Sequence, residues 1–242
     1  MERIVYDRMA ELDQHHWWYR ARREVLSALI RRRALPPEGA RILEVGCGTG
    51  HNLPMLAQFG TVEAIEVDPA ARAVAEQRLG KPVGSAPLPQ LDGVSECAFD
   101  LIASLDVIEH IEDDGAALAS IARRLKPGGR FVMTVPAHGW MWSAHDEVNH
   151  HKRRYSKAAL KRLVEASPLK LEALGYFNSL LFPLAVGARL SGKITGKQDS
   201  DDKLPPEPLN KALEAVFAQE ARLIGLVPLS PGLSLFAVAS AT

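Results

Sequence analysis

Three glycines at alternate positions carry the clearest chemical signal in this sequence. An apolar run ends in Gly46, Gly48 and Gly50, and the acid Glu44 stands two residues before the first of them. Glycines permit a tight turn and let a ligand lie against the backbone, and the helix expected next offers free N–H groups to anionic atoms. The spacing differs from the G-x-G-x-x-G of dinucleotide-binding proteins. A carboxylate at Glu44 also disfavours a pyrophosphate and suits a ligand with an ammonium group.

Two more polar places follow apolar runs that read as strands. Glu66 ends the run that begins at Thr61, and an acid there can accept hydrogen bonds from both hydroxyls of a ribose. Asp106 begins the segment 106–110, which follows the run 99–104. The carboxyl ends of parallel strands meet at one edge of a sheet. We therefore expect Glu44, Glu66 and Asp106 to line one crevice.

The elements that position these residues alternate between strand and helix. Strands are expected at Ala40–Val45, Thr61–Glu66, Phe99–Ser104, Arg130–Val135, Leu169–Leu174 and Leu233–Ala239, with a short one near Pro82–Val83. Helical spacing of apolar residues falls between them. Such alternation predicts an α/β fold with a doubly wound, Rossmann-like sheet covered by helices on both faces.

The organisation is that of a single domain over residues 1–242. Residues 13–33 are expected to form an N-terminal helix that acts as a lid or docks on the domain, and residues 40–136 a cofactor-binding core. Residues 137–155 are expected to form a polar and aromatic loop. Residues 177–230, between the last two strands, are longer than an ordinary loop and predict a helical insertion or lid.

At this point the chain resembles the class I S-adenosylmethionine-dependent methyltransferases of the type 11 family. The segments Ile42–Gly50, Ala64–Asp68, Phe99–His110 and Leu125–Arg130 are similar to successive motifs of that family, in the same order. The resemblance implies a seven-stranded sheet with its last strand antiparallel. It also implies S-adenosylmethionine as cofactor and S-adenosylhomocysteine as product. The ammonium and sulfonium groups of this cofactor agree with the acid at Glu44.

The resemblance assigns cofactor contacts to residues on four segments. Those expected are Glu44, Gly46, Cys47, Gly48 and Gly50 around the methionine part, Glu66 at the ribose, Val67 and Ser85 at the adenine, and Leu105 and Asp106 near the adenine or the sulfur. Ser85 stands where family members often carry an Asp for the adenine amino group. A serine hydroxyl can still accept that hydrogen bond.

The polar and aromatic segment 137–155 is the expected methyl-acceptor site. A general base is expected among His145, Asp146 and His150, because histidine suits proton removal near neutral pH. Acceptor contacts are expected from Tyr19, Arg20, Trp140, Trp142, Arg153, Arg154 and Tyr155. The alternative is a solvated loop whose aromatic side chains pack on the lid. The histidine spacing matches no standard metal motif, so no metal site is expected.

The amino-acid composition limits the classes of partner that we expect for this protein. Lys+Arg and Asp+Glu both number 29, and the resulting neutral charge argues against a nucleic acid substrate. Two cysteines, expected as reduced thiols, and no visible secretory signal favour a cytoplasmic protein. No apolar run reaches the ~20 residues that a transmembrane helix needs. The apolar stretch 177–190 could still touch a membrane surface or form a dimer contact, and the oligomeric state stays open.

The sequence thus predicts methyl transfer from S-adenosylmethionine to a small-molecule or amphiphilic acceptor. Whether oxygen, nitrogen or carbon is methylated stays open. One alternative is a non-catalytic module that binds S-adenosylmethionine or acts as a scaffold. Another is a nicotinamide-dependent oxidoreductase, which the glycine spacing and Glu44 disfavour.

Overall fold

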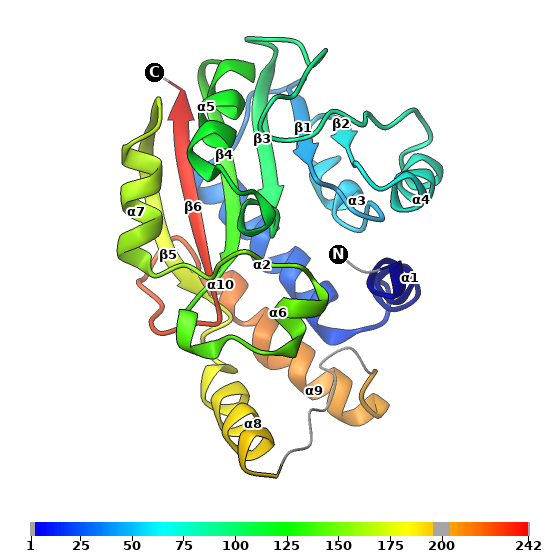
Figure 1. Cartoon of the computed structure of the whole chain (residues 1–242), viewed down its shortest axis with the longest axis vertical. Helices are drawn as coiled ribbons and strands as arrows, with labels where there is room; N and C mark the ends of the chain where they lie inside the picture. Colours follow the sequence, from blue (N-terminus) through cyan, green and yellow to red (C-terminus); the bar gives the residue numbers. More distant parts are fainter. Residues whose placement is uncertain (1–2, 196–203, 242) are drawn as a thin grey trace.

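A computed structural model describes residues 3–195 and 204–241, arranged around one twisted sheet (Figure 1). Within those residues the sheet has six strands: β1 (Arg41–Val45), β2 (Thr61–Ile65), β3 (Phe99–Leu105), β4 (Leu125–Pro136), β5 (Leu169–Phe177) and β6 (Ser234–Ala241). The helices of the described residues are α1 (Arg3–Leu12), α2 (Trp17–Arg33), α3 (Leu53–Leu56), α4 (Pro69–Leu79), α5 (Asp114–Arg124), α6 (Ala144–Val148), α7 (Lys157–Glu165), α8 (Phe182–Thr195), α9 (Glu207–Ala218) and α10 (Glu220–Leu223), with 3₁₀ turns η1 (Ile108–His110) and η2 (Gly139–Met141).

The strand order is β2-β1-β3-β4-β6-β5. Strands β2, β1, β3 and β4 are parallel, and β6 pairs antiparallel with both β4 and β5. The predicted α/β sheet with an antiparallel last strand is confirmed. In a sheet of this kind the carboxyl ends of the parallel strands share one edge, where ligands bind. The loops after β1, β2 and β3 meet there.

The strand expected near Pro82–Val83 is not formed in the described residues. Only an isolated parallel bridge joins Ile65 to Gly84 beside β2. Gly84 donates to the carbonyl of Ala64 and accepts from Glu66. Proline has no N–H to donate to a ladder, so Pro82 limits the pairing at this edge. The expected seventh strand is therefore reduced to one bridge, and the sheet has six strands.

Apolar side chains on both faces of β1 and β3 make the sheet doubly wound. Ile42 packs in a cluster with Val25 and Leu29 of α2, whereas its neighbour Leu43 packs in a second cluster with Leu118 of α5. Successive side chains of a strand point to opposite faces. Each fully buried aliphatic side chain contributes about 1.5–3 kcal/mol, so both helical layers anchor the strands that carry the site.

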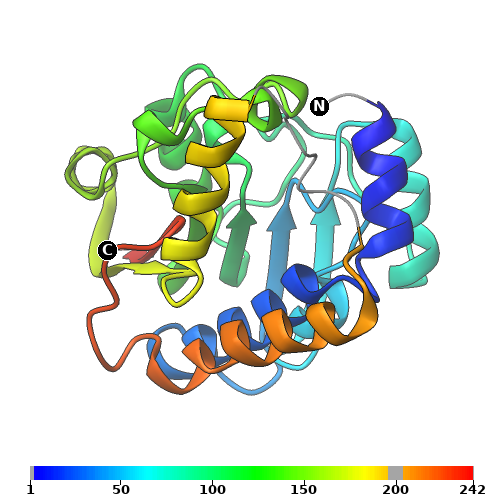
Figure 2. The same cartoon turned by 90° about the horizontal axis from the view of Figure 1, so that it is seen from below.

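The N-terminal segment forms two helices where one was predicted. Helix α2 starts at Trp17, because the backbone of His16 is extended and its side chain accepts a hydrogen bond from the N–H of Trp18 at 3.2 Å. Residues Arg3–Leu12 form the separate helix α1, which lies beside α4 (Figure 2). Arg78 of α4 pairs with Asp13 and also donates to the carbonyl of Ala10.

The insertion is helical, as predicted, and its second half packs on the N-terminal helix. The side chain of Asn210 at the start of α9 accepts from Trp17 N at 2.9 Å and donates to the carbonyl of His15 at 2.8 Å. Arg32 of α2 donates to the carbonyls of Ala221 and Ile224. Helices α9 and α10 thus belong to the layer that covers one sheet face. No helix in the described residues is both long and apolar enough to span a membrane.

Candidate cofactor and acceptor site

The glycine-rich loop after β1 is a turn that only small residues can form. Gly46 has φ +73°, and a Cβ built there would lie 2.6 Å from a methyl carbon of Val107. Gly48 has φ +56°. The N–H groups of Gly46 and Cys47 both donate to the carbonyl of Ile65, which ties the loop to the end of β2. The predicted cradle is therefore present, with Val107 of the loop after β3 forming its side.

Glu44, one residue before the end of β1, is a buried acid with an unused oxygen. Asn52 donates to its Oε1 at 3.0 Å, while Oε2 has no hydrogen-bond partner in the described chain. Burial raises the pKa of Glu44 to about 8, although the Asn52 hydrogen bond and the charge of Arg22 oppose that rise. A cationic ligand group beside Oε2 would supply the missing partner. The side-chain atoms Thr49 Oγ1 and His51 Nδ1 in the same loop are also buried and have no hydrogen-bond partner among residues 3–195 and 204–241.

Glu66 lies beside this loop at the end of β2. Its Oε2 accepts from the N–H of Gly48 and its Oε1 from the N–H of Asp68, both at 2.8 Å. These bonds fix the carboxylate and leave each oxygen a second lone pair. Val67, next along the chain, is 56% exposed and offers an apolar surface. Ser85, expected at the adenine, is exposed just beyond the bridge at Gly84.

Helix α1, which was not predicted from the sequence, covers the cradle. The hydroxyl of Tyr6 hydrogen-bonds to Glu66, and burial raises the pKa of this tyrosine above its usual range. The sulfur of Met9 lies 3.3 Å from the position that a Cβ on Gly48 would take. Val5, Met9 and Leu12 recur at helical spacing, which is the sequence signal that could have revealed this helix.

A buried arginine links α2 to the loop after β3. Arg22 Nη2 donates to Asp106 Oδ2 and to Thr134 Oγ1, both at 2.8 Å, and Thr134 donates to the other Asp106 oxygen. Asp106 has φ +61°, a conformation that non-glycine residues seldom adopt. Leu105 before it is buried. The predicted site residue Asp106 is therefore held by Arg22, which was not predicted as a site residue from the sequence.

Tyr19 and Arg20, the two residues of α2 expected to contact the acceptor, lie in different surroundings. The ring of Tyr19 contacts the ring of His51 in the glycine-rich loop, with centroids 5.2 Å apart. Arg20 is exposed and its Nε pairs with Glu214 of α9 at 2.9 Å. Tyr19 thus lies at the cradle, whereas Arg20 joins the helix layer.

Aromatic side chains of the segment 137–155 gather against the insertion. His138, at φ +61°, stacks on Tyr176 of β5 with centroids 5.4 Å apart and contacts Phe182 of α8 at the same separation. Trp140 is 58% exposed and meets Phe182 edge to face, and Trp142 is half-buried. The result is an aromatic group, made of His138, Trp140, Tyr176 and Phe182, that opens to the surface.

Asp146 holds this segment together. It accepts two hydrogen bonds from Arg154, at 2.7 and 3.0 Å, one from the backbone of Ser143, and one shared with Nδ1 of His151 at 2.9 Å. The bonds from His151 and Arg154 outweigh burial and hold the pKa of Asp146 well below its usual range. An acid so paired is a poor base, so we reassign Asp146 and Arg154 from chemistry and acceptor binding to positioning. The predicted bases His145 and His150 are exposed.

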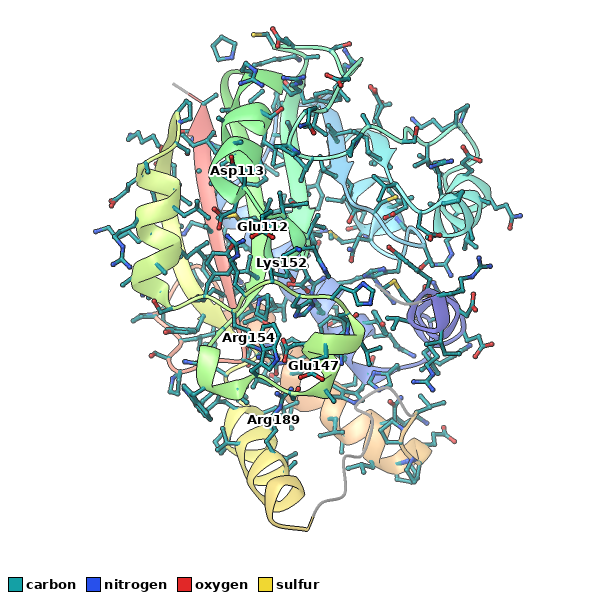
Figure 3. All side chains as sticks on the ribbon, in the orientation of Figure 1. Glu112, Asp113, Glu147, Lys152, Arg154 and Arg189 are labelled. Atoms are coloured by element: carbon teal, nitrogen blue, oxygen red, sulfur yellow. The ribbon has the colours of Figure 1, made fainter. Side chains whose placement is uncertain are left out.

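Other polar side chains tie the same segment to α5 and the turn before it, and one such pair, Lys152 and Glu112, is labelled in Figure 3. Lys152 pairs with Glu112 at 3.1 Å. Arg153 Nη1 and the hydroxyl of Tyr155 both donate to Asp114, at 2.9 and 2.7 Å. Arg153 and Tyr155 were expected to contact the acceptor, and the structure places both in this anchoring network.

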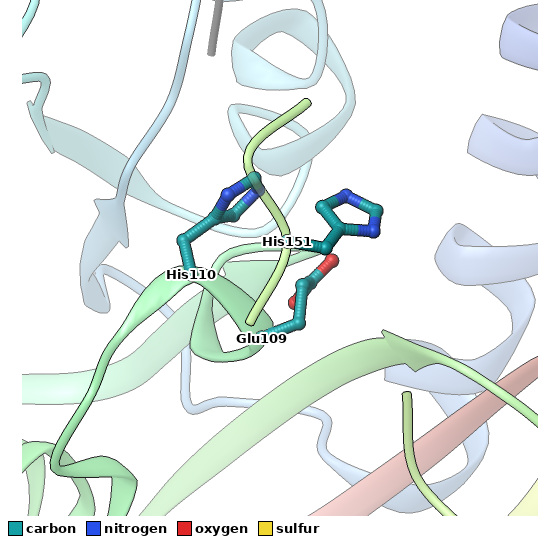
Figure 4. Close-up of side chains that lie close together, drawn as sticks. All are labelled: Glu109, His110 and His151. Carbon is teal, nitrogen blue, oxygen red and sulfur yellow. The ribbon is translucent and has the colours of Figure 1, made fainter. Parts of the chain in front are cut away.

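Three other side chains come together where none was expected. Glu109 and His110 of η1 meet His151, and one potential metal-ligand atom from each lies within 4.8 Å of the others (Figure 4). Burial, with the nearby charge of Asp106, raises the pKa of Glu109 well above its usual range. Burial and the neighbouring His151 lower the pKa of His110 to about 4. Glu109 and His151 are 42 residues apart, so spacing alone did not reveal the group.

Comparisons with known proteins agree with this geometry. A family model described as a methyltransferase domain matches residues 17–174. A ubiquinone biosynthesis O-methyltransferase from Caulobacter vibrioides is 37% identical over 107 residues, which are 41% of this chain and 42% of that relative. The chain thus matches about two fifths of the length of that relative.

Solved structures share the fold. A phosphoethanolamine N-methyltransferase 2 from Haemonchus contortus, in complex with S-adenosyl-L-methionine, has a TM-score of 0.58 at 18% identity, over 89% of this chain and 51% of that one. A geranyl diphosphate C-methyltransferase from Streptomyces coelicolor, in complex with Mg²⁺, geranyl diphosphate and S-adenosyl-L-homocysteine, has a TM-score of 0.57 at 14% identity, over 94% and 87%. The family model matches more than half of this chain, so the chain belongs to the class I S-adenosylmethionine-dependent methyltransferases.

Proposed function

We propose that this chain transfers the methyl group of S-adenosylmethionine to a small-molecule or amphiphilic acceptor. The observation that carries the proposal is Glu44, a buried acid near the end of β1 and directly before the glycine cradle, one of whose oxygens has no hydrogen-bond partner in the part of the chain that the structure describes. A buried carboxylate without a full set of partners is costly unless a cation neutralises it. The ammonium group of a bound amino acid moiety would do so.

The residues present fit this cofactor. Glu44 would take the ammonium group, and the backbone of Gly46 and Gly48 would lie against the methionine part. Glu66, already fixed by two backbone N–H groups, would have a second lone pair on each oxygen for the ribose hydroxyls once Tyr6, which hydrogen-bonds to it, moves away. Val67 and Leu105 offer apolar surface to the adenine. When bound, the cofactor supplies an activated methyl group on a sulfonium, so this chain has mainly to align the acceptor and exclude water.

Helix α1 contributes the exclusion of water. Tyr6 and Met9 lie over Glu66 and Gly48 at the cradle. The chain must therefore move α1, or at least these two side chains, to admit the cofactor. We propose that α1 is the lid of this site, and that α2, expected to be either a lid or a docking helix, is the fixed helix on which the site is built.

An acceptor with an apolar part is favoured by the surface near the loop after β4. Trp140, Leu180 and Leu184 are large apolar side chains that are 43–60% exposed around the start of α8. The relative named for ubiquinone biosynthesis supports an aromatic or isoprenoid-like acceptor. The net charge of zero gives no support to a nucleic acid substrate. Contact of this surface with a membrane would bring such an acceptor within reach.

The test measures formation of S-adenosylhomocysteine by chromatography, with S-adenosylmethionine and a panel of acceptors. The panel holds a catechol, a phenol with a long alkyl chain, and a phosphorylated amino alcohol. We expect turnover with the first or second, and at least a tenfold loss in Glu44→Gln. Glu63→Gln, an exposed acid on β2, is the matched control and should keep its rate. Tight cofactor binding without turnover on any acceptor class would favour a non-catalytic binding module.

A further inference from the structure

Two segments that are far apart in the chain meet beside the cradle. Turn η1 carries Glu109 and His110, and the segment after α6 carries His151. The N–H of Lys152 donates to the carbonyl of Glu109 at 2.9 Å, which fixes one segment to the other through their backbones. The three side chains converge, with one ligand atom from each within 4.8 Å of the others (Figure 4).

Glu109 is the unexplained member of this group. Its side chain is 0% exposed, and neither carboxylate oxygen has a hydrogen-bond partner in the described residues. The positive charges of Arg22 and Arg154 act on it without forming an ion pair that would satisfy it. Two unpaired oxygens in a dry site call for a cation, because buried charges are found paired or bound to metals.

Both histidines are oriented as metal ligands usually are. Nδ1 of His151 is engaged by Asp146 at 2.9 Å, which leaves Nε2 for another partner. Asp146 is in turn held by Arg154. His110 hydrogen-bonds to the backbone carbonyl of His150. A carboxylate or carbonyl on the far nitrogen of a histidine is the usual outer support of a metal site.

We propose that Glu109, His110 and His151 bind a divalent transition-metal ion, and that its open positions bind an oxygen of the methyl acceptor. Two imidazole nitrogens and one carboxylate are the donor set of catalytic zinc sites, which keep a position open for water or substrate. Such nitrogen donors favour zinc, iron or cobalt over magnesium. Asp146 would then act by orienting the metal ligand His151, and its own carboxylate would take no part in the chemistry.

The position of the metal ion suits the binding of a methyl acceptor, and this acceptor role rests on the proposed function. Val107, two residues before Glu109, packs against Gly46 of the cradle. A metal ion lowers the pKa of a bound hydroxyl group. The O–H bond then breaks and its proton passes to solvent, the oxygen forms the new bond to the methyl carbon, and the C–S bond breaks with its electron pair left on sulfur. The metal is not consumed, and the acceptor is a hydroxyl compound.

The first test titrates the EDTA-treated full chain with ZnCl₂, CoCl₂ and MnCl₂ by calorimetry, with S-adenosylhomocysteine binding measured on each sample. We expect one zinc ion per chain. Glu109→Gln and His151→Ala should weaken zinc binding at least tenfold and leave S-adenosylhomocysteine affinity within twofold, which also shows that they fold. Glu112→Gln, whose side chain is 80% exposed, should bind zinc as the wild type does.

Two results would overturn the metal site. One is a wild type that binds S-adenosylhomocysteine but none of the three ions, and the other is equal zinc binding by Glu109→Gln. Zinc binding without S-adenosylhomocysteine binding would instead count against the proposed function alone, so the two failures are distinguishable. Zinc should also raise the melting temperature of the wild type and leave that of Glu109→Gln unchanged.

The acceptor role is tested with 4-nitrocatechol, whose absorption shifts when its oxygens bind a metal ion. The cobalt- or zinc-loaded wild type should shift the spectrum, whereas Glu109→Gln under the same conditions should not. An unshifted spectrum with the metal-loaded wild type would refute binding of the acceptor oxygen. Methylation of a hydroxyl acceptor that is unaffected by EDTA would refute it as well.

Discussion

Replacing Glu44 by glutamine is predicted to stabilise this protein while it weakens cofactor binding at least tenfold. Glu44 is buried, and in the described chain only Asn52 hydrogen-bonds to its side chain. Folding without the cofactor therefore places a carboxylate where its charged form is poorly solvated. Glutamine has nearly the same shape and keeps an oxygen for Asn52, but it carries no charge to desolvate.

The magnitude follows from the pKa of Glu44, which burial raises from 4.5 to about 8 in the folded chain. The unfolded chain holds the lower value, so the folded state is favoured below pH 4.5 and loses that advantage as the pH rises through 8. For the wild type the loss is about 3 kcal/mol at pH 7 and about 5 kcal/mol above pH 8. Glu44→Gln does not suffer this loss. Its free energy of unfolding should therefore exceed that of the wild type by under ~1 kcal/mol at pH 5 and by several kcal/mol at pH 9.

The assay is urea unfolding of the cofactor-free protein at pH 5, 7 and 9, for the wild type, Glu44→Gln and the control Glu63→Gln. The control replaces an exposed acid that pairs with Arg41, so its effect should stay within about 1 kcal/mol at each pH. A Glu44→Gln protein that is equally or less stable than the wild type at pH 9 would refute the reasoning. So would a difference between the two that does not grow with pH.

Three further substitutions, one of them with a matched control, test other parts of the site. Gly46→Ala should weaken S-adenosylhomocysteine binding in calorimetry at least tenfold, because the added methyl would lie 2.6 Å from a valine methyl carbon at φ +73°; unchanged affinity would contradict the cradle. Asp146→Asn should lower the free energy of unfolding by about 3 kcal/mol, since a buried ion pair loses one partner. The exposed His150→Ala in the same segment should change it by under about 0.5 kcal/mol, and equal effects would remove the distinction. Tyr6→Phe frees Glu66 of one hydrogen bond and should raise S-adenosylhomocysteine affinity about fivefold, roughly 1 kcal/mol, in the same titration, whereas a loss of affinity would mean that the hydroxyl contacts the ligand.

The parts of the fold that follow a local pattern could be predicted from the sequence. Apolar runs alternating with helical spacing gave the parallel strands, and the glycines after Val45 marked the turn. Both signals act over a few residues, where backbone geometry dominates. The strand near Pro82 was wrong because an edge position with a proline supports only one bridge, at Gly84.

The roles of polar residues in the segment 137–155 depended on their partners, which the sequence does not specify. Asp146 and Arg154 have the residue types of a base and an anion clamp, but they pair with each other at 2.7 Å. The same holds for Tyr155, which donates to Asp114 of α5. Glu109 and His151 were missed for the opposite reason, because the fold joins them across 42 residues.

Calorimetric titration of the purified chain with S-adenosylhomocysteine and with NAD tests the central claim most directly. The account predicts binding of the adenosyl compound with a dissociation constant in the micromolar range, about −8 kcal/mol, and no binding of NAD. It also predicts at least a tenfold loss of affinity in Glu44→Gln. A folded wild type that binds NAD, or that binds neither compound, would contradict the assignment of this site.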